Sequence, residues 1–344
     1  MLLKRLSEAS GVSGDEAEVR SLLKEELSLH VEQVTTDALG NLYLKKGIGR
    51  KPRVMVAAHM DEVGLMVVGY EKSGLLRVVK VGSIDDRVLA SKVVAVGKDR
   101  VPGVIGAKAV HLQKPTERTK AIEISNLYID IGVRSQEEAE KLIKIGEYAT
   151  FTVTVREAGD NCLIGKAFDN RAGCAILAEL LKEDFNLELN AVFTVQEEVG
   201  LRGAGVAAYS LHPDLALVIE TTAAADVVGS KEASYVTKLG DGPAITLMDS
   251  TYMAPQLIVD LVAETAENLA IPYQFRRLTT AGTDAGIISQ THSGILSAVI
   301  SVPCRYLHSP ASIINMEDWQ NTLRLTRGIL NSIAEGGLRL AGTA

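Results

Sequence analysis

The chain has 344 residues, and 36 Lys and Arg stand against 43 Asp and Glu, which gives a formal net charge of −7. This length corresponds to roughly two domains, and 47% hydrophobic residues are enough for a sizeable core. The acidic balance argues against a non-specific nucleic-acid binder, which needs a basic face. Only 4% of the residues are aromatic, so stacking platforms for single-stranded nucleic acid or polysaccharide are scarce.

The sequence predicts a cytoplasmic protein with no membrane partner. Its three cysteines are too few and too scattered for a disulfide framework. Lys4, Arg5 and Glu8 interrupt the first apolar run, so we expect no signal peptide. Residues 285–304 carry no formal charge, but Ser and Gly residues divide them. We therefore expect a helix, a turn and a buried strand there, and not a membrane span.

The first 60 residues predict one amphipathic helix and three strands. Apolar residues recur at helical spacing over 15–29, and Ser13 or Asp15 could cap that helix. Residues 31–46 have the pattern of a hairpin that turns at a Gly-Asn pair, and residues 54–59 form an apolar run typical of a buried strand.

The middle of the chain has a different pattern. Short Val-rich runs separated by Gly, Pro and charged turns fill residues 64–162, with one expected helix over 135–145. This spacing is typical of a small barrel or sandwich. After residue 165 strands and helices alternate again. The expected helices cover 170–181, 255–269 and 317–333, and the expected strands cover 190–195, 215–219 and 298–302.

This alternation predicts an α/β fold in which helices pack on both faces of a sheet. The simplest organisation is one α/β domain, made of residues 1–62 and 164–344. Residues 63–163 would then form a β-rich domain inserted into it.

Three predicted strands lead into side chains that can bind metal. The first ends at His59, the second runs into Glu197 and Glu198, and the third ends at Glu220. In an open α/β sheet, ligands bind outside the carboxyl ends of the strands. We therefore expect these side chains to meet in one crevice, together with Asp169 at the start of a predicted helix.

His308 follows another predicted strand and completes a set of two histidines and three carboxylates. Zn²⁺, Co²⁺ and Mn²⁺ accept such a mixture. A pair of ions about 3.5–4 Å apart needs a bridging carboxylate and further ligands on each side. Asp169 as the bridge, His59 with Glu220, and Glu198 with His308 satisfy this requirement.

Two more acidic residues have an expected role beside the metals. Asp61 lies two residues past His59, so it could accept the second imidazole N–H and fix the tautomer. Glu197 is the spare carboxylate, and a glutamate there could act as the general base that takes a proton from water.

Each residue also has a structural explanation. A lone histidine is more often structural than a ligand, a Glu-Glu pair is usually solvated, and Asp169 before a helix is by default an N-cap. Charged residues at the ends of three buried strands are costly unless they are paired or bind metal. Order and composition alone therefore support a metallohydrolase and a structural explanation about equally.

Several motifs occur in an order that resembles the glutamyl/deblocking aminopeptidase family, which includes the tetrahedral (TET) aminopeptidases. They are AAHMDEVG at 57–64, KAFDNRAG at 166–173, VQEEVGLRGA at 195–204, AGTDAG at 281–286 and RYLHSP at 305–310. GVSGDEAEVR at 11–20 and DALGNLY at 37–43 fit the opening of the family. The similarity covers essentially the whole chain.

The resemblance implies a cytoplasmic di-metal aminopeptidase that acts on short peptides, with Zn or Co as the metals. It implies a zinc-exopeptidase-like α/β/α sandwich with an inserted β-barrel-like dimerisation domain, and dimers that could build a tetrahedral dodecamer. By motif, the resemblance implies that His59 and Glu220 bind one metal, that Glu198 and His308 bind the other, and that Asp169 bridges them. It also implies that Glu197 is the base and that Asp61 orients His59. The chain departs from the family at Glu220, where many members have Asp.

Three questions remain open from the sequence. Some relatives carry an endoglucanase label, and a glycoside hydrolase would use two carboxylates and no metal. A non-catalytic peptide-binding or assembly protein is another alternative. Asp284 in AGTDAG could bind the substrate amine, favour basic residues or only cap a helix, so the side-chain preference is not determined.

Overall fold

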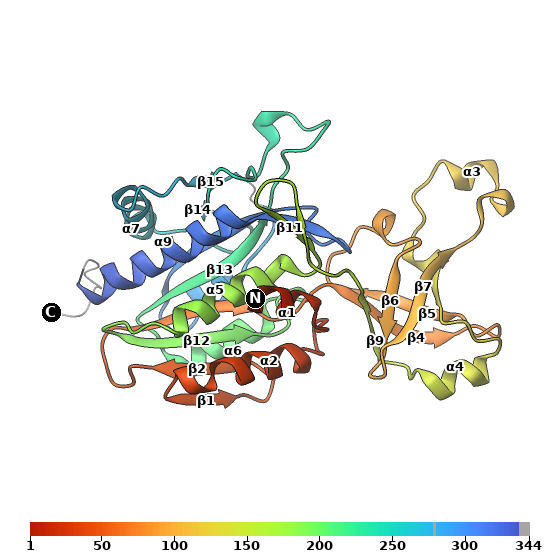
Figure 1. Cartoon of the computed structure of the whole chain (residues 1–344), viewed down its shortest axis with the longest axis horizontal. Coiled ribbons are helices and arrows are strands. Elements are labelled where there is room, and N and C mark those ends of the chain that lie inside the picture. The colour runs from red at the N-terminus through yellow and green to blue at the C-terminus, as the bar shows by residue number, and fades with distance from the viewer. Residues whose placement is uncertain (278–279, 337–344) are drawn as a thin grey trace.

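One large mixed sheet and one closed barrel organise the chain, and they lie side by side in the computed structural model (Figure 1). The structure describes residues 1–277 and 280–336. In spatial order the large sheet contains β1 (Gln33–Thr36), β2 (Leu42–Lys46), β12 (Glu188–Thr194), β3 (Arg53–His59), β13 (Leu215–Ala223), β16 (Leu296–Arg305), β17 (Ser312–Asn315), β11 (Cys162–Gly165) and β10 (Arg156–Ala158). In addition, β14 (Ala244–Thr246) pairs with β16, and β15 (Gln274–Arg276) pairs with β14.

The centre of the large sheet is parallel. Strands β12, β3, β13 and β16 run in the same direction, so their carboxyl ends open on one edge. These strands are buried along almost their whole length, as expected for parallel strands that are covered on both faces.

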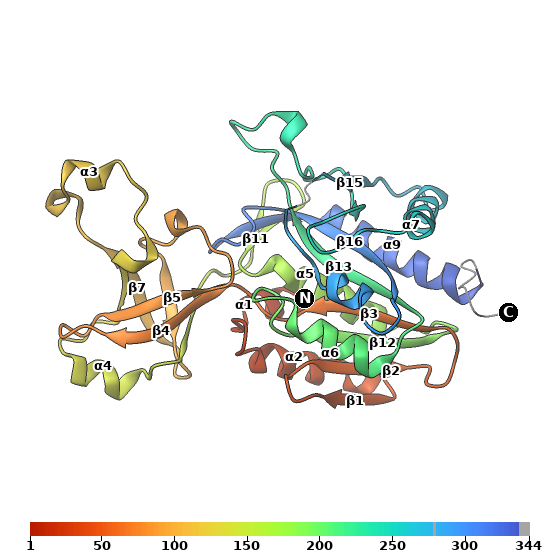
Figure 2. The same ribbon diagram turned by 180° about the vertical axis from the view of Figure 1, so that it is seen from behind.

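Helices cover both faces of this sheet (Figures 1 and 2). One face packs against α1 (Leu2–Glu8), α2 (Ala17–Leu27), α5 (Phe168–Leu181), α7 (Gln256–Asn268) and α9 (Met316–Ala334). The other face packs against α6 (Arg202–Leu211) and α8 (Asp284–Ser289), with a smaller apolar core. The predicted α/β/α sandwich is therefore confirmed.

The barrel has its own apolar core and closes in the order β4-β5-β8-β7-β6-β9. Its strands are β4 (Gly64–Tyr70), β5 (Leu76–Val81), β6 (Val93–Val96), β7 (Val101–Ala107), β8 (Leu127–Asp130) and β9 (Tyr148–Phe151). Helix α3 (Pro115–Arg118) lies between β7 and β8, and α4 (Gln136–Leu142) between β8 and β9. Strands β10 and β11 pair within the large sheet. The division into domains at residues 63 and 163 stays a prediction.

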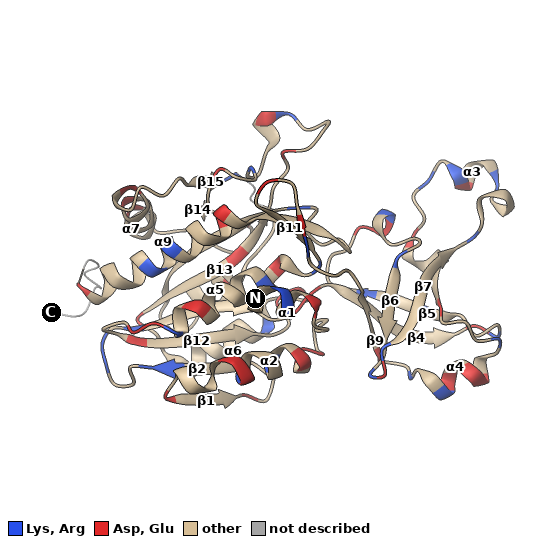
Figure 3. Cartoon of the chain, in the orientation of Figure 1, with Lys and Arg blue, Asp and Glu red and all other residues tan. Residues whose placement is uncertain are grey.

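Short 3-10 helices cover Ser28–His30, Asp86–Val88, Val110–Leu112, Ile124–Asn126 and Glu232–Ser234. In the part of the chain that the structure describes, none of the helices combines the length and the apolar character that a membrane crossing requires. Basic and acidic residues are interspersed over both the sheet domain and the barrel (Figure 3).

Two details of the expected elements are corrected by the structure. Helix α2 begins at Ala17 with Glu16 at the N-cap position and without a side-chain cap, so neither Ser13 nor Asp15 caps it. The hydroxyl of Ser13 donates to Asp61 instead. Strand β13 continues to Ala223, so Glu220 lies within the strand and not at its end. The uncharged segment 285–304 forms helix, turn and strand as expected.

Candidate metal centre and catalytic site

The candidate site lies where the parallel strands of the large sheet end. His59 is the last residue of β3, and Glu220 lies near the end of the adjacent strand β13. Glu197 and Glu198 follow β12 in the turn before α6. The crevice rule for open α/β sheets therefore accounts for their meeting.

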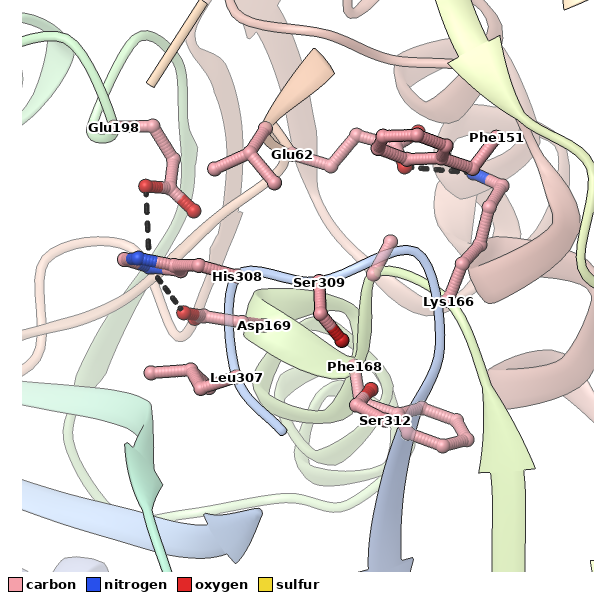
Figure 4. Close-up of a pocket in the computed structure, with 12 residues that line it drawn as sticks. Glu62, Phe151, Lys166, Phe168, Asp169, Glu198, Leu307, His308, Ser309 and Ser312 are labelled. Atoms are coloured by element: carbon pink, nitrogen blue, oxygen red, sulfur yellow. Dashed lines mark hydrogen bonds and ion pairs between the residues drawn. The ribbon is translucent and has the colours of Figure 1, made fainter. Parts of the chain in front are cut away.

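The structure brings the five expected metal ligands together in two groups that share Asp169. His59 Nε2 lies 3.2 Å from Asp169 Oδ1 and 3.3 Å from Glu220 Oε1. His308 Nε2 lies 3.2 Å from Asp169 Oδ2 and 3.3 Å from Glu198 Oε2. Figure 4 shows His308 between the carboxylates of Glu198 and Asp169. Each oxygen of Asp169 thus faces a different histidine.

The backbone at Asp169 departs from a regular helix. Asp169 and Asn170 have non-helical dihedral angles inside the segment assigned to α5. The carboxylate of Asp169 does not cap the helix. The structure therefore does not support the alternative explanation of Asp169 as an N-cap.

The arrangement of the donor atoms suits divalent ions. In each group, three ligand atoms lie within 4.8 Å of one another. Among the described residues, Glu198 Oε1 and Glu220 Oε2 are buried and have no hydrogen-bond partner. A buried carboxylate oxygen without a donor is costly, and carboxylates with imidazoles are a ligand mixture that Zn²⁺ and its neighbours accept. The residues present fit two divalent ions.

The electrostatics of the cluster agree with a site built for cations. Burial raises the pKa of Glu198 to about 8 and raises the pKa of Glu197 well above its ordinary value. Burial opposes protonation of His308, but the carboxylates of Glu198 and Asp169 outweigh this effect and raise its pKa to about 9. Positive charge is therefore favoured at this position.

Asp61 is fully buried and makes more contacts than the sequence indicates. Its Oδ1 lies 3.4 Å from His59 Nδ1, which also lies 3.2 Å from the main-chain oxygen of Asp61. The same carboxylate accepts the backbone N–H groups of Glu197 and Glu198 and the hydroxyl of Ser13. Asp61 therefore contacts both His59 and the turn that carries the two glutamates.

Glu197 lines a cavity of about 90 Å³ together with His59, Asp169, Glu220 and His308. Asp284 is buried on α8, where its Oδ2 accepts a hydrogen bond from Thr194 Oγ1 at 2.7 Å.

The remaining histidines lie elsewhere in the structure. His212 and His292 stack on each other with ring centroids 3.7 Å apart. His30 and His111 are exposed.

A buried ionic network beside the site was not anticipated. Lys166 Nζ lies 2.7 and 2.8 Å from the two carboxylate oxygens of Glu62 (Figure 4), and it also donates to Ala9 O. The guanidinium of Arg171 donates to four main-chain oxygens, three in the N-terminal segment and one on Met60, directly after β3. One of its nitrogens also lies 3.4 Å from Glu62 Oε1. The sequence contained a signal for this network, because Glu62 lies in the motif at 57–64 and Lys166 and Arg171 lie in the motif at 166–173.

Arg276 was also missed. It ends β15 and lines the same cavity as Glu197. No motif contains it, and β15 itself was not predicted, so the sequence offered no signal for its place.

Comparison with known proteins gives consistent results along the chain. A model of the M42 glutamyl aminopeptidase family matches residues 40–325. A protein of Acetivibrio thermocellus named putative aminopeptidase is 42% identical, over 94% of this chain and 96% of that protein. The lysyl aminopeptidase of Pyrococcus furiosus is 31% identical, over 96% of both chains.

Solved structures show the same similarity. A TET aminopeptidase from a marine sediment archaeon of the Thaumarchaeota has a TM-score of 0.94 at 34% identity and covers 98% of both chains. The TET1 peptidase of Pyrococcus horikoshii, which can assemble into a tetrahedron or a large octahedral shell, has a TM-score of 0.86 at 31% identity, over 96% of this chain and 98% of that one. A Thermotoga maritima protein described as an endoglucanase has a TM-score of 0.80 at 38% identity, over 96% and 97% of the two chains.

Proposed function

Since this chain belongs to the M42 glutamyl aminopeptidase family, we propose that it is a metal-dependent aminopeptidase that removes N-terminal residues from short peptides. The observation that carries the proposal is the sharing of Asp169 between His59 and His308, with an acidic residue beside each histidine. A bridging carboxylate with ligands on both sides is what a pair of catalytic ions requires.

His59 and Glu220 would hold one divalent ion, Glu198 and His308 the other, and Asp169 would bridge them. Zn²⁺ and Co²⁺ suit these ligands best, and Mn²⁺ is a third candidate. When bound, such ions lower the pKa of water and polarise the scissile carbonyl. The Oε1 atom of Glu220 lies 3.3 Å from His59 Nε2.

Glu197 would act as the general base. Its carboxylate lines the cavity beside the proposed ligands, and burial raises its pKa, which favours proton uptake. It would take a proton from the attacking water and pass it to the leaving amine. Asp61 would act as a positioning residue, because it contacts His59 and also binds the backbone of Glu197.

The substrate must have a free α-amine, which the acidic side chains or a metal would hold. This requirement makes the enzyme an exopeptidase. The names of the family and of the Pyrococcus furiosus relative differ in the side chain that they mention, glutamyl and lysyl. The preference of this chain must therefore come from its own residues.

The proposal is tested by hydrolysis of aminoacyl-p-nitroanilides with chelator-stripped protein, after addition of Zn²⁺, Co²⁺ or Mn²⁺. N-acetylated substrates are the control. We expect metal-restored cleavage of the free-amine substrates only. Cleavage of acetylated substrates, or none with any metal, contradicts the proposal.

Two other functions have less support. A glycoside hydrolase with two carboxylates does not need the two histidines of this site, and it would be insensitive to chelators. A non-catalytic peptide-binding protein would bind peptides without turnover when fully loaded with metal. A proton acceptor at Glu197, next to the proposed ligands, would have no use in such a protein.

We further propose that the barrel is a dimerisation domain, and that dimers assemble into a tetrahedral dodecamer in the cytoplasm. Apolar side chains on the barrel strands, namely Val68, Val79, Val93 and Val104, are between 43% and 53% exposed. Exposed apolar residues of this kind support a contact with another subunit. Light scattering of the purified protein would give the mass. A monomer at micromolar concentration contradicts the proposal.

A further inference from the structure

A buried guanidinium with unused donors lies next to the proposed catalytic centre. The side chain of Arg276 is only 5% exposed. Among the residues that the structure describes, its Nε and Nη1 are buried and have no hydrogen-bond partner. Buried polar groups are usually hydrogen-bonded, and leaving a charged group unpaired is costly. The position of Arg276 therefore calls for an acceptor that the described residues do not supply there.

Asp249 balances the charge of Arg276 but does not occupy its donors. The distance from Arg276 Nη1 to Asp249 Oδ2 is 3.7 Å, which is too long for a hydrogen bond. The carboxylate of Asp249 is instead bound by its own surroundings, since Oδ1 accepts from the backbone of Thr251 and Tyr252 and Oδ2 accepts from Thr283 Oγ1. Asp249 thus keeps the guanidinium in place and leaves its N–H groups available.

The side chain of Arg276 lines the cavity of about 90 Å³ that Glu197 and Glu220 also line. Ser301 lines the same cavity, and in the described part of the chain its hydroxyl is buried without a partner. Ser301 is the residue of β16 that pairs with Glu220 of β13. A substrate group that reaches Arg276 and Ser301 would therefore belong to a peptide held at the metal ligands.

We propose that Arg276, assisted by Ser301, is a specificity-determining residue that binds a carboxylate of the peptide substrate. A planar guanidinium matches the two oxygens of a carboxylate and cannot lose its charge. Two groups of a short peptide carry this chemistry, the side chain of an N-terminal Asp or Glu and the carboxyl terminus of a dipeptide. The inference rests on the proposed aminopeptidase function, because it assigns a substrate class to that same site.

Each source of the carboxylate has its own comparison. p-Nitroanilides have no terminal carboxylate, so Glu- against Gln-p-nitroanilide reports the side chain alone. Ala-Ala against Ala-Ala-amide reports the carboxyl terminus alone. We expect kcat/KM to favour the carboxylate by about 10- to 100-fold in at least one pair.

The Arg276→Gln variant should lose this preference, and its ratio of kcat/KM for the acid and the amide should fall towards 1. Arg277→Gln, in which the neighbouring arginine is exposed, is the matched control and should keep the wild-type ratio. Arg276→Lys retains the charge without the planar fork and should give an intermediate ratio. The Arg276→Lys variant also replaces Arg276→Gln as the test if the glutamine variant does not fold.

Some outcomes overturn the inference. If the wild type cleaves the amides as well as the acids in both pairs, or if Arg276→Gln keeps the preference, Arg276 does not bind a carboxylate. If the wild type cleaves nothing, the proposed function fails instead. Calorimetric binding of L-glutamate against L-glutamine, and of Ala-Ala against its amide, to metal-loaded protein then decides the role of Arg276. Equal affinities within both pairs overturn it.

Discussion

The carboxylate of Asp61 accepts a hydrogen bond from the backbone N–H of Glu197 at 3.0 Å. Its second oxygen accepts the N–H of Glu198 at 3.1 Å and the hydroxyl of Ser13 at 2.6 Å. One buried side chain therefore links the end of β3 to the turn that carries the proposed base and a proposed ligand. A change at Asp61 should disturb both sides of the centre.

We expect Asp61→Asn to weaken metal binding by about 10- to 100-fold. The amide has only one acceptor oxygen, and its NH2 group would face a backbone N–H. Affinity is measured by competition with a coloured chelator. Asp37→Asn is the control, because Asp37 also accepts several backbone N–H groups but lies in the β1–β2 turn. Equal loss of affinity in both variants would show that Asp61 acts only through stability.

The ion pair of Lys166 with Glu62 should dominate the stability of the wall beside the site. Lys166→Met leaves a buried carboxylate without its main partner, so the free energy of unfolding in urea should fall by about 3–5 kcal/mol. Lys182→Met is the control, since Lys182 is partly exposed in its contacts with Glu179 and Glu26, and it should cost about 1 kcal/mol or less. A similar small cost in both variants would contradict this account.

Because of Lys166, we expect the free energy of unfolding to depend on pH. Burial lowers the pKa of Lys166 from an ordinary value of 10.5 to about 8. Between these two pH values the unfolded chain binds more protons than the folded chain. The free energy of unfolding therefore increases as the pH rises. From about pH 7 to 9.5 the wild type should gain about 1–2 kcal/mol relative to Lys166→Met. A difference that stays constant or narrows over this range would show that the ammonium is not disfavoured by burial.

Removal of metal should lower the melting temperature. Without cations, Glu198 and Glu220 keep buried oxygens that no described residue binds. Binding to the folded state alone stabilises it, by about 4 kcal/mol at a metal concentration 1,000 times Kd. We expect Zn²⁺ to raise the melting temperature of stripped protein by roughly 5–10 °C. His308→Ala should reduce this rise, and a wild-type protein without any response would argue against a metal centre.

Much of the fold followed from patterns within single segments. The apolar run that forms β3 and the alternation of strands and helices after residue 165 predicted an α/β sheet covered by helices, and the sheet edge then predicted where His59 and Glu220 meet. These inferences succeeded because parallel strands share one carboxyl edge.

What the sequence did not predict depends on contacts between distant segments. Ser13 was an expected helix cap, but Asp61, which is 48 residues away, uses its hydroxyl. Arg276 belongs to a three-residue strand with no periodic pattern, and only the folded chain places it on the wall of the cavity. Hydrogen bonds of this kind leave no regular spacing in a sequence.

The central claim is that Glu197 drives hydrolysis at a centre held by the five ligands. The most direct test is the Glu197→Gln variant, with kcat on a free-amine p-nitroanilide and metal content measured on the same sample. We predict that the variant keeps the metal content of the wild type and loses about 10²–10⁴ in kcat. Wild-type turnover in the fully metal-loaded variant would contradict the account.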